Sequence, residues 1–223
     1  REKIMSLHLQ RDLNDLKLDI LHLGSLVETS IGNASVALKD RRPELADIVF
    51  ANEVLINEKE VNIEENCLKI LALHQPVATD LRFIVVVLKV NNDLERIGDL
   101  AENLTERAVY LSERDALAAP TTKINDMFIT IRSMLKDSLD SLVKLDVGLA
   151  RKVIAQDDSV DEINREMYDD FRALVAVNGS VVEQATSLLS CSRYLERIAD
   201  LATNICEEVL FMVEGEVVRH RGY

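Results

Sequence analysis

The sequence predicts an all-α protein built from two tandem, pseudo-repeated three-helix bundles of long antiparallel helices. Its 223 residues include only seven glycines and three prolines, and aromatic residues make up 4 %. Few chain-breaking residues favour long helices, and few aromatic residues disfavour sheets. The segment 94–103, LERIGDLAEN, returns as 195–204, LERIADLATN, with eight of ten positions identical at an offset of 101 residues. This repeat predicts an internal duplication.

The first half is predicted to contain three helices. Leucine and isoleucine recur at three- and four-residue steps over residues 3–38, which is typical of an amphipathic helix. Pro43 suits the first turn of a second helix, which ends near Leu73 because the residue before Pro76 avoids the α conformation. A third helix over residues 77–111 carries an apolar stripe with the spacing of a bundle seam.

A linker between the two halves is predicted at Ser112–Thr122, where alanine and proline cluster. It divides the chain into a first bundle, 1–115, and a second bundle, 116–223. The next helix is expected over residues 124–145.

The second half repeats the plan of the first. Asp146 can cap the start of a fifth helix, because its side-chain oxygen can accept from a free backbone N–H. Asn178-Gly179-Ser180 ends that helix. The sixth helix carries an apolar stripe over residues 188–212 that matches the stripe of the third.

Composition narrows the functional classes. The net charge of -13 disfavours nucleic acid as a partner and favours cations or basic protein surfaces.

The three cysteines have no C-x-x-C spacing, so we expect buried thiols in a reducing cytoplasm. The longest apolar run, Ile84–Leu88, is far below the roughly 20 residues of a membrane helix, and no signal peptide is visible.

The repeated phrase places two acids on one helix face in each half. Glu95 and Asp99 are four residues apart, as are Glu196 and Asp200. Like charges at this spacing disfavour a helix by about 0.2–0.5 kcal/mol per pair, so their repetition calls for an explanation. One explanation is a site for a hard cation, because carboxylate and amide oxygens suit such ions. The other is ordinary surface ion pairing with neighbours such as Arg96.

A metal site needs more ligands than one helix supplies, and adjacent helices of a bundle can add them. Glu53 and Asn57 on the second helix align with Asp157 and Asp161 on the fifth. The acids that form these four-residue pairs are the predicted metal ligands: Glu53, Glu95, Asp99, Asp157, Asp161, Glu196 and Asp200.

Several segments resemble the signature of the PhoU family of phosphate-uptake regulators, and the likeness covers essentially the whole chain. They are Gln75–Arg82, Lys89, Leu94–Ala101, Glu196–Asn204 and the ending Met212–His220. The resemblance implies two repeated three-helix bundles that bind divalent or trivalent metal ions (Fe, Mn, Mg or Zn), in some members as multinuclear clusters. It also implies negative regulation of phosphate uptake and of the phosphate-starvation response.

The partners that the resemblance implies are the ATPase subunit of the phosphate ABC transporter, a phosphate-sensing histidine kinase and a second copy in a homodimer. The protein is then cytoplasmic and meets the membrane only through these partners. Two departures from the family pattern concern the sites. Asn57 stands where an Asp is usual, and Gly98 is replaced by Ala199 in the second copy. The second half is therefore predicted to hold the more complete site.

Two other functions compete with a metal-binding adaptor. A carboxylate-bridged metal oxidase on a helical bundle normally needs Glu-x-x-His pairs, and none of the four histidines follows a Glu by three residues. A helical scaffold that binds partners without metal is the third possibility. We predict no catalytic residues, no organic cofactor and no enzymatic activity.

Overall fold

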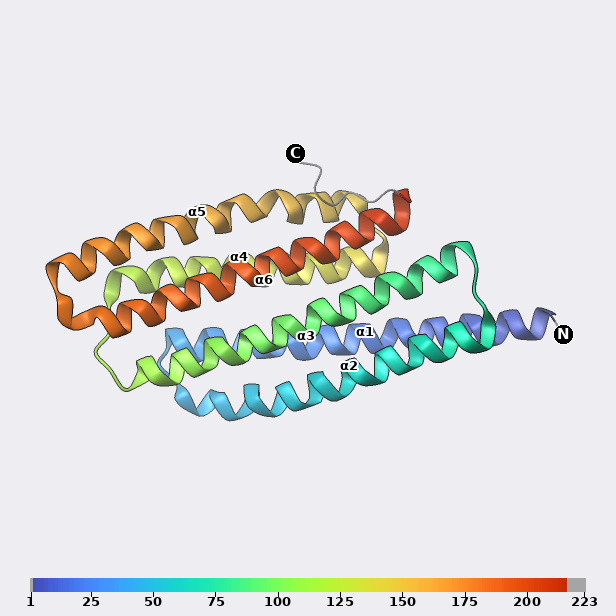
Figure 1. The fold of residues 1–223 in the computed structure, drawn as a ribbon, viewed down its shortest axis with the longest axis horizontal. Helices are drawn as coiled ribbons and strands as arrows, with labels where there is room; N and C mark the ends of the chain where they lie inside the picture. The colour runs from blue at the N-terminus through green and yellow to red at the C-terminus, as the bar shows by residue number, and fades with distance from the viewer. Residues whose placement is uncertain (1, 216–223) are drawn as a thin grey trace.

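The computed structural model describes residues 2–215, which form six long helices and no strand (Figure 1). Residues 216–223, which hold most of the family-like ending, lie outside the described residues. One turn of 3-10 helix precedes the second and the sixth helix. The elements are α1 (Glu2–Lys39), η1 (Pro43–Leu45), α2 (Ala46–His74), α3 (Ala78–Ser112), α4 (Ala118–Lys144), α5 (Val147–Val177), η2 (Gly179–Val181) and α6 (Val182–Glu214).

Each half is a bundle of three antiparallel helices, which confirms the predicted fold class. Helices α1, α2 and α3 contact one another, and so do α4, α5 and α6. The halves meet where α3 lies beside α6 and α1 lies beside α4, so that α2 and α5 form the two outer edges (Figure 1).

The apolar stripes predicted on α3 and α6 form the centre of the core. Leu94 and Ile97 on α3 are fully buried, as are Leu195 and Ile198 on α6. Buried residues of all six helices join them in one continuous cluster.

The three cysteines are buried as predicted, and burial raises the pKa of each thiol to about 12. They therefore stay neutral and are poor metal ligands.

The helix ends follow local chemistry. The Asp146 carboxylate accepts from the backbone N–H of Leu149 at 2.9 Å, so the predicted cap is confirmed. The linker is shorter than predicted, because α4 begins at Ala118. Pro120 lies in the first turn of α4, where its missing N–H breaks no helical hydrogen bond. The proposed boundary between the halves falls in the remaining connection, 113–117, and the division into two units stays a prediction.

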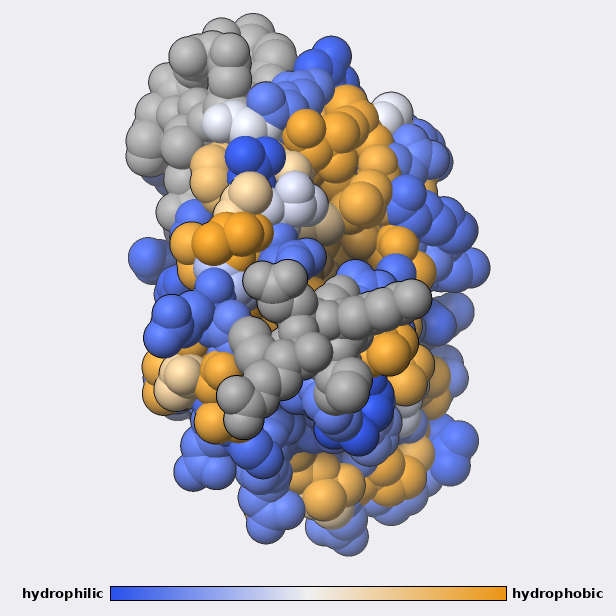
Figure 2. All heavy atoms as spheres, turned by 90° about the vertical axis from the view of Figure 1, so that its right-hand side faces the viewer, coloured by the Kyte–Doolittle hydropathy of each residue, from blue (hydrophilic) through white to orange (hydrophobic). Residues whose placement is uncertain are grey.

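The surface at one end of the molecule is partly apolar. Figure 2 shows hydrophobic side chains gathered at the end that carries the α2–α3 and α4–α5 connections, and exposed residues there include Val77, Leu145 and Val213. None of the helices described is long and apolar enough to cross a membrane.

A buried ion pair joins the two halves. Lys89 Nζ on α3 lies 2.9 Å from Glu208 Oε2 on α6, and the Glu208 side chain is only 2 % exposed. The cations of Lys89 and Arg82 lie 5.3 and 5.7 Å from the ring centroid of Phe211, and Arg82 also donates to the carbonyl of Met212.

Replacing Lys89 with alanine should destabilise the fold, because the buried Glu208 carboxylate loses this ion pair. We expect a loss of about 3 kcal/mol in the free energy of unfolding, at the low end for a buried pair because water reaches Lys89. The control is Lys144→Ala, which removes an exposed pair with Asp140 and should cost less than about 0.5 kcal/mol. Equal losses in urea unfolding of the two variants would contradict the prediction.

Candidate functional site

We use the names first groove and second groove for the lines along which α2 packs against α3 and α5 packs against α6. Glu53 is the buried acid of the first groove. The residue is 7 % exposed, and neither of its carboxylate oxygens has a hydrogen-bond partner among the described residues. Burial raises the pKa of Glu53 to about 7, the Asp99 carboxylate on α3 adds to this increase, and the Asn57 amide opposes it, although neither neighbour lies within hydrogen-bond distance and angle of Glu53. Buried polar groups nearly always have a hydrogen-bond or charge partner. A positively charged partner would offset the cost of burying the ionised Glu53 carboxylate.

Further acids continue the first groove along α3. Burial raises the pKa of Glu95, and the negative charges of Asp99 and Glu60 add to the effect. The Asn91 amide on α3 donates to the backbone carbonyl of Glu60 at 2.9 Å and to its side chain at 3.3 Å. This bond fixes α2 against α3 beside Glu95.

A second groove lies between α5 and α6. Burial raises the pKa of Asp157 to about 7, with the charges of Asp200 and Asp161 as the next causes. The pKa of Glu196 is raised by burial and then by Asp200 and Asp161. Burial also raises the pKa of Asp200, with Asp161 as the next cause. Asp161 therefore faces both acids of α6, and Asp157 Oδ1 is buried without a hydrogen-bond partner in the described part of the chain.

The two grooves are related by the internal repeat. In the second groove the Ser192 hydroxyl of α6 donates to the Asn164 side chain of α5 at 2.6 Å. Ser192 is offset by 101 residues from Asn91, and Asn164 by 104 residues from Glu60. The same crossing point between helices thus carries a hydrogen bond in both halves, although the residues differ.

The structure brings the predicted acids together in these two sets, Glu53, Glu95 and Asp99 in the first groove and Asp157, Asp161, Glu196 and Asp200 in the second. Among residues 2–215, none of the seven takes part in an ion pair. The arginines of the same helices nevertheless lie near these acids, because the charges of Arg96 and Arg197 act against the increase in the pKa of Glu95 and of Asp200.

Two further acids of the first groove are not among those predicted from the sequence. Glu60 raises the pKa of Glu95, and Glu102 raises the pKa of Glu53. The helical spacing could have found them. Glu60 follows Glu53 by two turns, and Glu102 follows Asp99 by one.

In neither groove do the described acidic side chains already lie at the mutual distances of metal ligands. Within the described residues, no three His, Cys, Asp or Glu side chains come close enough together to hold a metal ion. Mutual repulsion between ionised carboxylates opposes such closeness when no cation lies between them. The oxygen-only donor set, with buried unpartnered carboxylate oxygens in each groove, nevertheless fits a hard cation.

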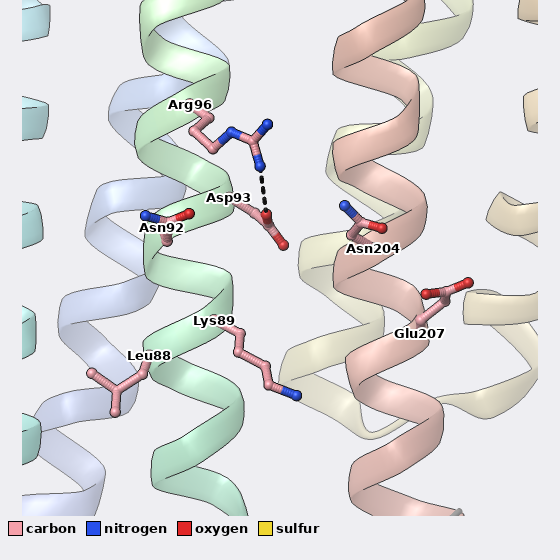
Figure 3. Close-up of a pocket in the computed structure, with 7 residues that line it drawn as sticks. All are labelled: Leu88, Lys89, Asn92, Asp93, Arg96, Asn204 and Glu207. Carbon is pink, nitrogen blue, oxygen red and sulfur yellow. Dashed lines mark ion pairs between the residues drawn. The ribbon is translucent and has the colours of Figure 1, made fainter. Parts of the chain in front are cut away.

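A separate pocket of about 650 Å³ opens between α3 and α6 (Figure 3). Lys89 extends from α3 toward α6, and Asp93 faces Asn204 across the pocket, as Figure 3 shows. Arg96 pairs with Asp93 at 4.0 Å. The lining mixes both signs of charge, and none of the predicted metal ligands belongs to it.

The raised pKa values predict a pH-dependent stability for the metal-free protein. The pKa of Glu53 is about 7 in the folded chain and near 4.5 when exposed. The folded state therefore binds more protons than the unfolded state between these values, so the free energy of unfolding falls as the pH rises from about 4.5 to 7. Glu53→Gln should reduce this fall, measured by urea unfolding at pH 5 and pH 8 with a chelator present.

The control for this experiment is Glu58→Gln, which changes an exposed acid on the same helix. It should leave the difference in stability between pH 5 and pH 8 as in the parent protein. The same difference in all three proteins would show that Glu53 does not titrate in this range.

Comparisons with known proteins show which family has this sequence and this fold. The sequence model described as "PhoU domain" matches residues 20–108 and 124–209, one copy in each half. The phosphate-specific transport system accessory protein PhoU homolog of Aquifex aeolicus is 37 % identical over 211 residues, which cover 95 % of both chains. The homolog of Clostridium acetobutylicum is 31 % identical and covers 94 % of this chain and 95 % of its own.

Solved structures agree with the sequence comparison. The crystal structure of PhoU from Pseudomonas aeruginosa has a TM-score of 0.91 at 32 % identity, covering 93 % of this chain and 99 % of that one. The phosphate transport system regulatory protein PhoU from Streptococcus pneumoniae has a TM-score of 0.87 at 28 % identity, covering 94 % and 99 %. The chain therefore belongs to the PhoU family.

Proposed function

We propose that this protein is a metal-binding signalling adaptor that restrains phosphate uptake and the phosphate-starvation response. In this role it links the ATPase subunit of the phosphate ABC transporter to a phosphate-sensing histidine kinase in the cytoplasm, acting as a homodimer. The support is that its relatives are accessory proteins of the phosphate-specific transport system, and that one solved relative is a regulatory protein of that system. No catalytic step is part of this function.

The observation that carries the metal part of the proposal is the buried carboxylate of Glu53, whose two oxygens have no hydrogen-bond partner in the described structure. A bound cation would neutralise it together with Asp99, the acid on α3 that raises its pKa. Mg²⁺, Mn²⁺ and Fe all accept oxygen ligands of this kind, and Zn²⁺ binds carboxylates as well.

Each groove contributes its own ligands to this proposal. Glu53, Asp99 and Glu95 would hold a cation between α2 and α3. Asp161 of the second groove stands where the first groove has Asn57, so the four-residue pair of the outer helix consists of two carboxylates only in the second half. We therefore expect the second site to bind a divalent cation more tightly. In each half the cation would attach the outer helix to its neighbour.

The metal proposal predicts that paired substitutions lower the metal content of the protein. Asp157→Asn with Asp200→Asn should remove the second site, and Glu53→Gln with Asp99→Asn the first. Metal is measured by elemental analysis of protein purified without an affinity tag, and Mn²⁺ should raise the midpoint of thermal unfolding of the parent. The control is Asp169→Asn, which changes an exposed acid farther along α5. Unchanged metal content in both double variants would leave a metal-free scaffold as the better account.

The adaptor proposal predicts two interactions and one phenotype. The purified protein should retain the transporter ATPase subunit and the cytoplasmic part of the kinase of its own organism in pulldown experiments. Deleting its gene should switch on a phosphate-starvation reporter while phosphate is plentiful. Retention of neither partner, together with a silent reporter, would rule the proposal out.

A further inference from the structure

Gly98 lies in the middle of α3, next to Asp99, and is buried. A glycine in a helix interior costs about 1 kcal/mol relative to alanine, so its presence needs a reason. A Cβ atom at Gly98 would lie 2.9 Å from Glu53 Oε2 and 3.1 Å from Ile56 Cδ1. The nearest group is thus the carboxylate of the first groove, which occupies the space that any other side chain at position 98 would need.

The second groove has the opposite combination at the equivalent positions. Ala199 replaces Gly98 and is fully buried, and Asp157 replaces Glu53. Aspartate is shorter than glutamate by one methylene group, which is about the room that a methyl side chain takes up. The longer carboxylate thus approaches a glycine, and in the internal repeat the shorter carboxylate and an alanine stand at the two equivalent positions.

We propose that Gly98 and Ala199 are positioning residues that set how far the buried carboxylate of each groove reaches over the neighbouring helix, and so set the affinity of each groove for a divalent cation. This inference rests on the proposed metal-binding function and adds the residues that make the two sites unequal. Residues that orient a metal ligand from outside the coordination shell change metal affinity by about 10- to 100-fold when they are mutated, and we assign Gly98 and Ala199 an effect of this order.

A purely structural role for Gly98 gives a different expectation. If glycine were needed only for close approach of α2 and α3, alanine would destabilise the protein whatever residue stands at position 53. If glycine makes room for the Glu53 carboxylate, the effect of alanine depends on position 53, because Glu53→Asp frees the space again. The two accounts can therefore be separated by a double-mutant cycle.

The test measures Mn²⁺ binding by calorimetry in protein whose second groove is disabled by Asp157→Asn and Asp200→Asn. In this background Gly98→Ala should weaken Mn²⁺ binding about 10- to 100-fold, and adding Glu53→Asp should recover most of the loss. Gly32→Ala on α1 is the matched control, because a Cβ there meets no atom within 4 Å. It should leave the affinity unchanged.

The reverse exchange gives a second measurement, in protein whose first groove is disabled by Glu53→Gln and Asp99→Asn. Asp157→Glu should weaken Mn²⁺ binding there, and Ala199→Gly should restore it. If neither starting protein binds Mn²⁺, the metal-binding function itself is wrong. If both bind but Gly98→Ala has no effect, or neither second substitution restores affinity, only the positioning role is overturned.

Discussion

The burial of two equivalent apolar stripes, one on α3 and one on α6, is the constraint on which the rest of the structure depends. Each stripe packs against the other two helices of its own half, while α3 and α6 also pack against each other. The acidic phrase shares these two helices, so the same register that buries Leu94 and Leu195 also fixes where the acids stand. The centre of the core and the site acids of α3 and α6 are therefore specified by one repeated segment, and α2 and α5 supply the remaining acids.

The carboxylates of the grooves oppose folding when they are ionised, and either protonation or a neighbouring positive charge relieves this cost. Glu53 and Asp157 are held in surroundings that favour their neutral forms, and further carboxylates lie close to each of them. Natural chains often retain such unfavourable groups at functional sites, where a ligand compensates the cost. The Lys89–Glu208 pair shows the contrasting arrangement, in which a buried carboxylate has its cation within the chain.

The sequence allowed prediction of the helices, of the duplication and of the helix faces that carry the seven acids, because all three depend on periodicity along the chain, whereas the role of these acids as metal ligands stays a prediction. The start of α4 was predicted too late, since Pro120 was taken to mark a linker although a first helical turn accepts proline. The burial of Glu53 depends on the absence of a side chain at Gly98 of a neighbouring helix. Such a relation between helices has no periodic signal, so only the structure shows it.

The position of α2 and α5 at the outer edges has a consequence for cooperativity. Among the described residues, α2 contacts only α1, α3 and η1, and α5 contacts only α4, α6 and η2. An edge helix can therefore detach with a smaller free-energy change than unfolding of the whole chain. With a cation in each groove, as proposed, each site would act on the local opening of one edge helix, and the two edge helices would influence each other only through the four inner helices.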